Sequence, residues 1–138
     1  MACIAAVGVA TCSPPEPATL PAAVPLELQV RNAGLPGGYI RLAPAAQGSQ
    51  GRWHKFGMAE FICVTCPTPF VGSRSGYDIL VLDTTCQVKG RYRTDGGQLL
   101  VDINIGPTVS LVKAQPITDW LPAESAPIDA AEVPCAAR

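Results

Sequence analysis

The chain has 138 residues, of which 10 are basic and 11 acidic, giving a formal net charge of −1. Its 13 glycines and 14 prolines make up about a fifth of the residues, against roughly 12% in an average chain. Such frequent helix breakers argue against a helical bundle, and the low charge argues against a disordered chain or a dedicated nucleic-acid-binding protein. A hydrophobic share of 48% allows a real core, so we expect one small, loop-rich, all-β domain.

The N-terminal segment combines a short apolar stretch, a cysteine and a spacer rich in proline. Residues 2–11 are uncharged and apolar or small, too short for a transmembrane helix of about 20 residues. Cys12 follows, and then the proline-rich tract 13–25 predicts an extended spacer. This order, with Val-Ala-Thr-Cys at 9–12, resembles the signal and lipobox region of bacterial lipoprotein precursors. The resemblance implies export with Cys12 as the lipid anchor; the alternative is a hydrophobic N-terminus with no targeting role.

From residue 26 onward, hydrophobic residues mostly recur at every second position, which is typical of strands with one buried face. Leu26, Leu28 and Val30, for example, alternate with polar residues. The pattern predicts strands at 26–31, 39–42, 53–64, 77–83, 86–93, 98–105 and 108–113. Thr-Asp-Gly-Gly at 94–97 predicts a tight hairpin, so that the last four strands would form an antiparallel meander.

About seven short strands separated by turns favour a small antiparallel β-sandwich of immunoglobulin-like or transthyretin-like type, with extended N- and C-terminal segments. The expected organisation is a signal-like segment at 1–12, a spacer at 13–25, the β-sandwich at 26–115 and an acidic tail rich in Pro and Ala at 116–138.

The tail holds two residues that are unusual in a solvated segment. Trp120 would be buried against the domain, and Cys135 would form a disulfide, so that both pin the tail. One helical turn is expected near residues 129–133. A free tail with an unpaired thiol is the alternative.

Four cysteines follow the spacer: Cys63, Cys66, Cys86 and Cys135. We expect two disulfides, each worth about 2 to 4 kcal/mol, because exported cysteines usually pair. Three connectivities are possible, and Cys86 is a natural partner for either member of the C-x-x-C pair at 63–66. A redox role is disfavoured, because a reactive dithiol needs a helix N-terminus and this pair ends a strand before Pro67.

A metal site is the alternative for the same residues. His54, the only histidine, could complete a zinc site with Cys63, Cys66 and Cys86, although a second closely spaced ligand pair is missing. We expect no cofactor and no catalysis, because no nucleophile or orienting group accompanies His54 in a recognisable motif.

Basic side chains recur on one predicted strand. Lys89, Arg91 and Arg93 would share an exposed face and could contact an anionic ligand such as a glycan or a phospholipid head group. The alternative is ordinary solvated surface that discourages edge pairing. Aromatic residues near the loops, such as Trp53 and Phe70, could form a sugar platform, but a chain with so few aromatics needs most of them in its core.

The sequence therefore predicts a non-catalytic, exported structural or binding module at a bacterial cell envelope, with membrane contact through the lipid anchor and no specific nucleic-acid partner. The alternatives are a subunit of an extracellular or viral assembly that joins neighbours by strand addition, and the small zinc protein.

Overall fold

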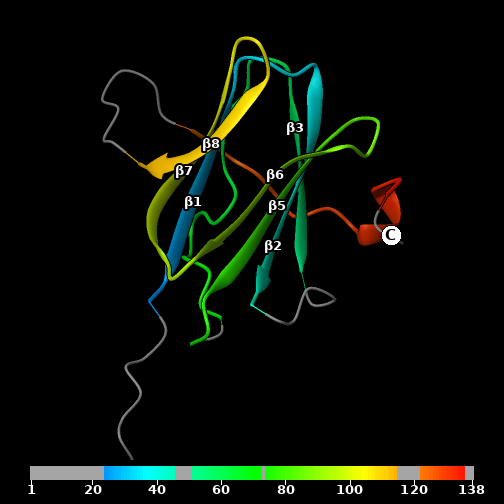
Figure 1. The fold of residues 1–138 in the computed structure, drawn as a ribbon. Helices are drawn as coiled ribbons and strands as arrows, with labels where there is room; N and C mark the ends of the chain where they lie inside the picture. Colours follow the sequence, from blue (N-terminus) through cyan, green and yellow to red (C-terminus); the bar gives the residue numbers. More distant parts are fainter. Residues whose placement is uncertain (1–23, 46–50, 73, 115–121, 136–138) are drawn as a thin grey trace, which may run out of the picture.

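The computed structural model describes residues 24–45, 51–72, 74–114 and 122–135, which form two β-sheets packed face to face (Figure 1). One sheet has five strands in the order β8-β7-β1-β4-β9, and the other has four in the order β3-β2-β5-β6. The strands are β1 (Leu26–Asn32), β2 (Gly37–Pro44), β3 (Arg52–Gly57), β4 (Phe61–Cys63), β5 (Tyr77–Asp83), β6 (Val88–Thr94), β7 (Gly97–Asn104), β8 (Thr108–Lys113) and β9 (Ala123–Glu124). The predicted β-sandwich is confirmed.

The core lies between the two sheets and follows from the alternation of side chains along each strand. Every second residue of a strand points inward, so the alternating apolar positions of the sequence meet in one layer. Its fully buried members include Leu26, Leu28 and Val30 of β1, Ile40 and Leu42 of β2, and Ile79 and Val81 of β5. The predicted strands at 26–31, 77–83 and 108–113 match β1, β5 and β8 within one residue.

The five-stranded sheet is mixed rather than purely antiparallel. Strand β1 pairs with β7 in parallel, from Leu26 opposite Gly97 to Asn32 opposite Ile103. The predicted hairpin at 94–97 is therefore wrong, because β6 and β7 belong to different sheets. Gly96 and Gly97, with φ of 115° and 100°, adopt backbone angles open mainly to glycine where the chain passes from one sheet to the other.

The C-terminal segment 122–135, called the C-terminal strap from here on, crosses from the five-stranded sheet to the outer side of the four-stranded one (orange to red in Figure 1). Its strand β9 pairs with β4, and the Ile128 amide donates to the Trp53 carbonyl over 2.8 Å. A short 3-10 helix, η2 (Ala130–Glu132), confirms the expected helical turn. Val133 and Cys135 are then buried against the sheet, with Cys135 bonded to Cys86.

The predicted pinning of the tail by Cys135 is thus confirmed, whereas Trp120 lies outside the described residues. The segment beyond residue 115 is not simply a solvated tail, since it supplies both a strand and a disulfide. Cys12 and the signal-like segment also lie outside the described residues. In the described ranges, no helix has the length and apolar character needed to cross a membrane.

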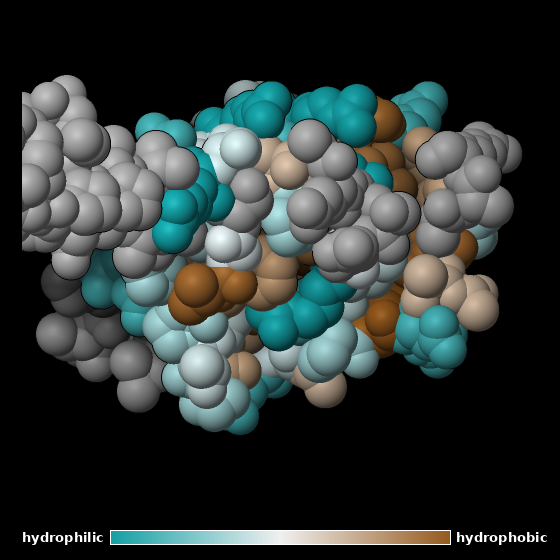
Figure 2. Space-filling model, turned by 90° about the horizontal axis from the view of Figure 1, so that it is seen from below, coloured by the Kyte–Doolittle hydropathy of each residue, from teal (hydrophilic) through white to brown (hydrophobic). Residues whose placement is uncertain are grey.

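β6 and β8 are the end strands of the two sheets on the side away from β3 and β9. The Tyr92 hydroxyl of β6 donates to the Val109 carbonyl of β8 over 2.8 Å and so joins them. Large exposed hydrophobic residues, such as Met58, Val71 and Ile105, are scattered along the chain. In the view of Figure 2, hydrophobic residues (brown) are separated by hydrophilic ones (teal) and form no single continuous patch.

Candidate functional site

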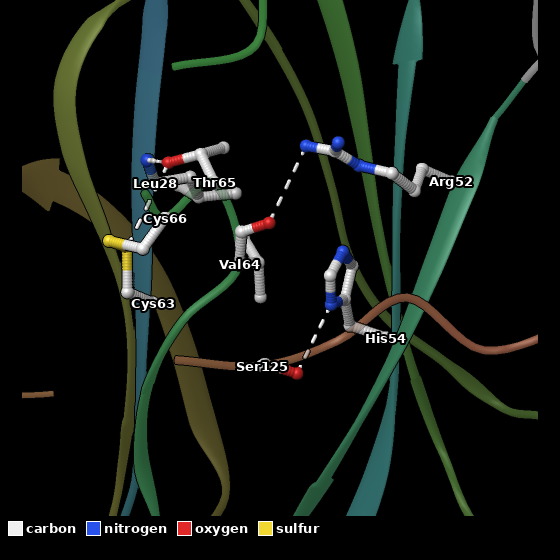
Figure 3. The surroundings of a disulfide bond; sticks show 8 residues. All are labelled: Leu28, Arg52, His54, Cys63, Val64, Thr65, Cys66 and Ser125. Atoms are coloured by element: carbon white, nitrogen blue, oxygen red, sulfur yellow. Dashed lines mark hydrogen bonds between the residues drawn. A yellow bond between two sulfur atoms is a disulfide. The ribbon is translucent and has the colours of Figure 1, made fainter. Parts of the chain in front are cut away.

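The C-x-x-C pair forms a disulfide on the outer face of the five-stranded sheet. Cys63 ends β4 opposite Gln29 of β1, and its Sγ is bonded to that of Cys66, three residues later. Thr65 holds the intervening turn against β1, because its Oγ1 accepts a hydrogen bond from the Leu28 amide over 2.9 Å (Figure 3). Cys63 is buried whereas Cys66 is exposed.

A pocket of about 210 Å³ lies beside this disulfide. The polar residues that line it are Glu27, Gln29, Gln98 and Thr65. Its apolar lining consists of Leu28, Pro67, Pro69, Ala114 and the disulfide itself. The pocket is smaller than the roughly 300 to 1,000 Å³ typical of ligand sites, and it offers one formal charge.

The four residues of the zinc hypothesis are not brought together as ligands. Cys63 and Cys66 are bonded to each other, and Cys86 is bonded to Cys135, so none of these sulfurs is a thiolate. In the described ranges, no group of three or more His, Cys, Asp and Glu residues could hold a metal ion. The expectation that Cys86 pairs with Cys63 or Cys66 is also wrong, because the C-terminal strap brings Cys135 to Cys86 instead.

His54 lies inside the protein, between β3 and the C-terminal strap. Its side chain is 1% exposed, and its Nδ1 lies 3.1 Å from Ser125 Oγ (Figure 3). Its Nε2 is buried without a hydrogen-bond partner. Burial, and to a smaller extent the positive charge of Arg52, lowers the His54 pKa from 6.5 to about 4. The imidazole is therefore neutral at pH 7 and out of reach of a substrate.

Arg52 precedes His54 by two residues and points to the same side of β3 (Figure 3). Its Nη2 lies 3.5 Å from the Val64 carbonyl oxygen, and its guanidinium carbon lies 4.9 Å from the centre of the Phe70 ring. Burial lowers the Arg52 pKa, and its Nε has no hydrogen-bond partner. Arg52 and His54 thus form a polar cluster between the two sheets. Their contacts with Val64, Phe70 and Ser125 lie within the same chain, as expected for a structural role.

The basic residues of β6 fall into two groups. Lys89 and Arg93 are near carboxylates, with Lys89 Nζ 3.7 Å from Asp83 Oδ2 and Arg93 Nε 3.9 Å from Asp78 Oδ1. Arg91 is exposed and makes no ion pair within the described part of the chain.

The register places Arg91 opposite Leu80 and Arg93 opposite Asp78, and so on one face of β6. A bulge breaks the pairing of β5 with β6 between Val81 and Leu82. Since Gly90 pairs with Val81 and Val88 pairs with Leu82, Lys89 is left without a partner in the register.

Sequence reasoning missed Arg41, which lies in the middle of β2. It neighbours Trp53 of β3 on one side and Leu80 of β5 on the other. Its guanidinium carbon lies 5.9 Å from the centre of the Trp53 ring. The signal was available, because Tyr39, Arg41 and Ala43 alternate with the core residues of the same strand.

The aromatic residues near the loops serve mainly the core. Trp53 is 7% exposed and Phe70 is partly buried against the core. Phe56 and Tyr77, the other two aromatic residues near these loops, are fully buried.

Comparison with protein-family models, with curated proteins and with solved structures gives no match.

Proposed function

We propose that this chain is a non-catalytic binding module of a bacterial cell envelope, held outside the cytoplasm by a lipid on Cys12. The observation that carries the proposal is the pair of disulfides Cys63–Cys66 and Cys86–Cys135, which is typical of proteins in a non-reducing environment. A lipid anchor followed by the proline-rich spacer at 13–25 would place the sandwich at a distance from the membrane.

The non-catalytic part of the proposal is supported by the position of the only histidine. A general base must come within hydrogen-bond reach of the proton it removes, and the His54 side chain is 1% exposed. The pocket beside Cys63–Cys66 offers Glu27 as its only ionisable side chain, with no neighbouring acid or base lining it. Recognition of a ligand is the role that such a disulfide-stabilised surface fits best.

The experiment that tests the proposal is the intact mass of the native protein, isolated from its host without reducing agent. We expect a chain that begins at a diacylglycerol-modified Cys12 and is lighter by two hydrogens for each of two disulfides. A Cys12→Ser variant should leave the membrane fraction, whereas a Thr19→Ser variant in the spacer should stay there. Free thiols on Cys63, Cys66, Cys86 and Cys135, or an unmodified Cys12, would contradict the proposal.

A second candidate, a subunit of an assembly, is favoured by the edge strand β8. This strand ends the five-stranded sheet and carries one charged residue, Lys113, at its last position. Such an edge can accept a strand from another chain, whereas β6 carries three basic residues. Sedimentation velocity distinguishes the two candidates: an assembly would grow with concentration and be blocked by Val112→Lys on β8 but not by Val24→Lys, which lies outside the strands.

A further inference from the structure

Four side chains stand in one row across the outer face of the four-stranded sheet. Trp53 pairs with Arg41, Arg41 with Leu80, and Leu80 with Arg91. The two arginines are therefore two strands apart, roughly 10 Å between Cα atoms, and flank Leu80. Both side chains are long and lie on the same face of the sheet, so their guanidinium groups can approach each other across Leu80, which belongs to the buried cluster that includes Val133 and Cys135 of the C-terminal strap.

Unlike the neighbouring basic residues of β6, these two arginines form no ion pair with a carboxylate in the described part of the chain. Lys89 and Arg93 have Asp83 and Asp78 within 3.7 and 3.9 Å, whereas no ion pair involves Arg41 or Arg91 among the described residues. The carboxylates of η2 are engaged locally. Asp129 Oδ1 accepts from the Ala131 amide, and Glu132 Oε2 accepts from the Asp129 amide.

Arg41 is half-buried beside Trp53 and has unused hydrogen-bonding capacity. The Trp53 ring lies beside its guanidinium group, yet Arg41 Nε is buried without a hydrogen-bond partner. Burial lowers the Arg41 pKa most, the positive charge of Arg91 lowers it further, and Asp78 opposes both. Arg41 is thus a partly desolvated cation close to a second cation and to Asp78, with one N–H donor unsatisfied, so a further negative group would stabilise it.

We propose that Arg41 and Arg91 form a binding site for an oxyanion, a phosphate or sulfate group carried by the ligand of this module. A guanidinium group presents paired N–H donors that match two oxygens of such a group, and two guanidinium groups around one oxyanion remove the repulsion between them. The inference rests on the proposed binding function and specifies the chemistry of its ligand.

The surroundings favour an oxyanion over a neutral sugar. Sugar recognition by stacking needs an open aromatic face, but Trp53 is 7% exposed and Leu80 9% exposed. The exposed Arg91, in contrast, stands at the edge strand where a ligand can approach from solvent. Arg91 would make the first contact, and the half-buried Arg41 would complete the site.

The test is titration of the full chain with inorganic phosphate and with sulfate. Calorimetry and the NMR signals of the arginine Nε–H groups monitor the binding. The decisive variant is Arg91→Gln, which changes an exposed side chain. The matched control is Arg93→Gln on the same strand, which removes the same charge from a residue that already has Asp78 nearby. We expect the Kd to rise about tenfold in Arg91→Gln and less than twofold in Arg93→Gln, with the Arg41 Nε–H signal shifting on binding.

A second arm distinguishes a free oxyanion from a lipid head group, using vesicles of phosphatidylglycerol with phosphatidylcholine vesicles as the reference. Binding to the vesicles alone, reduced more by Arg91→Gln than by Arg93→Gln, would assign the site to a lipid phosphodiester. Binding to free phosphate with the same order of variants would assign it to a mobile oxyanion. Equal effects of the two variants, or no saturable binding to any probe, would overturn the inference. The intact mass and thiol count test the proposed lipid anchor and disulfides separately, so failure of the proposed function can be told apart from failure of the oxyanion site.

Discussion

Cys86 and Cys135 are bonded to each other across a separation of 49 residues, and this bond holds the C-terminal strap on the four-stranded sheet. Cys63 and Cys66, in contrast, are three residues apart and close a single turn. The entropy that a cross-link removes from the unfolded chain rises with the length of the loop it closes. The two disulfides therefore differ in how much of the fold each one restrains.

We expect the double variant Cys86→Ser/Cys135→Ser to lose about 4 kcal/mol of unfolding free energy, and Cys63→Ser/Cys66→Ser to lose about 2 kcal/mol. The first variant also frees the strap, so Val133 should lose its protection from hydrogen exchange, while the core residue Val30 keeps its own. Urea unfolding of both variants measures which of them loses more unfolding free energy. A larger loss from the Cys63/Cys66 variant would show that the turn, and not the strap, is the restraint that matters.

Stability should fall on acidification because of His54. In the folded protein burial lowers the His54 pKa from 6.5 to about 4, so the unfolded chain binds more protons between these values. The stabilisation is fully present above pH 6.5 and decreases as the pH falls to about 4, with a total loss of about 3 kcal/mol. Urea unfolding at intervals between pH 7 and pH 4 measures the loss.

The control for this prediction is His54→Gln, which retains a polar side chain but does not titrate. Its stability should vary less between pH 6.5 and pH 5 than that of the unchanged protein, even if it is lower at pH 7. Since His54 is the only histidine, its ring signals in the NMR spectrum report the pKa directly. A midpoint near 6.5 in the folded protein would contradict the prediction.

The limits of sequence-based prediction are clearest at β6 and β7. The alternation of side chains located both strands, and on β7 it identified the inward positions of Val101 and Ile103. It could not show which sheet each strand joins, because the inner faces of both sheets require the same apolar pattern. The glycines at 96 and 97 therefore predicted a hairpin, whereas they connect the two sheets.

The candidate site shows the same limit. Arg91 and Arg93 were recognised from the pattern of one strand, but Arg41 lies 50 positions earlier and becomes their neighbour only through the pairing of β2, β5 and β6. The bulge at Lys89 could not be predicted from the alternation of side chains along β6. The partner of Cys86 was equally undetermined, because it depends on the path of the C-terminal strap.

Asn32 should be among the polar residues most sensitive to substitution. It is 2% exposed, and its Nδ2 donates to the carbonyl oxygens of Leu35 and Gly57 over 2.9 and 2.8 Å. Its Oδ1 accepts from the Leu35 amide over 3.0 Å. Asn32→Asp would place an oxygen against two carbonyl oxygens, so we expect a loss of about 3 kcal/mol, measured by urea unfolding. Asn104→Asp, at an exposed position, is the control and should change stability by less than about 0.5 kcal/mol.

Gly38 should not tolerate a side chain, because β2 passes close to two neighbours at this point. An added Cβ would collide with the carbonyl oxygen of Leu82 and lie 2.6 Å from the Phe56 ring. Phe56 is fully buried and cannot move without disturbing the core. We expect Gly38→Ala to cost about 2 to 3 kcal/mol by overpacking. At the adjacent Gly37 the nearest atom to a Cβ lies 3.1 Å away, so Gly37→Ala should cost about 1 kcal/mol or less. Thermal and urea unfolding of the two variants test this order, and equal losses would show that the backbone shifts to accept the methyl group.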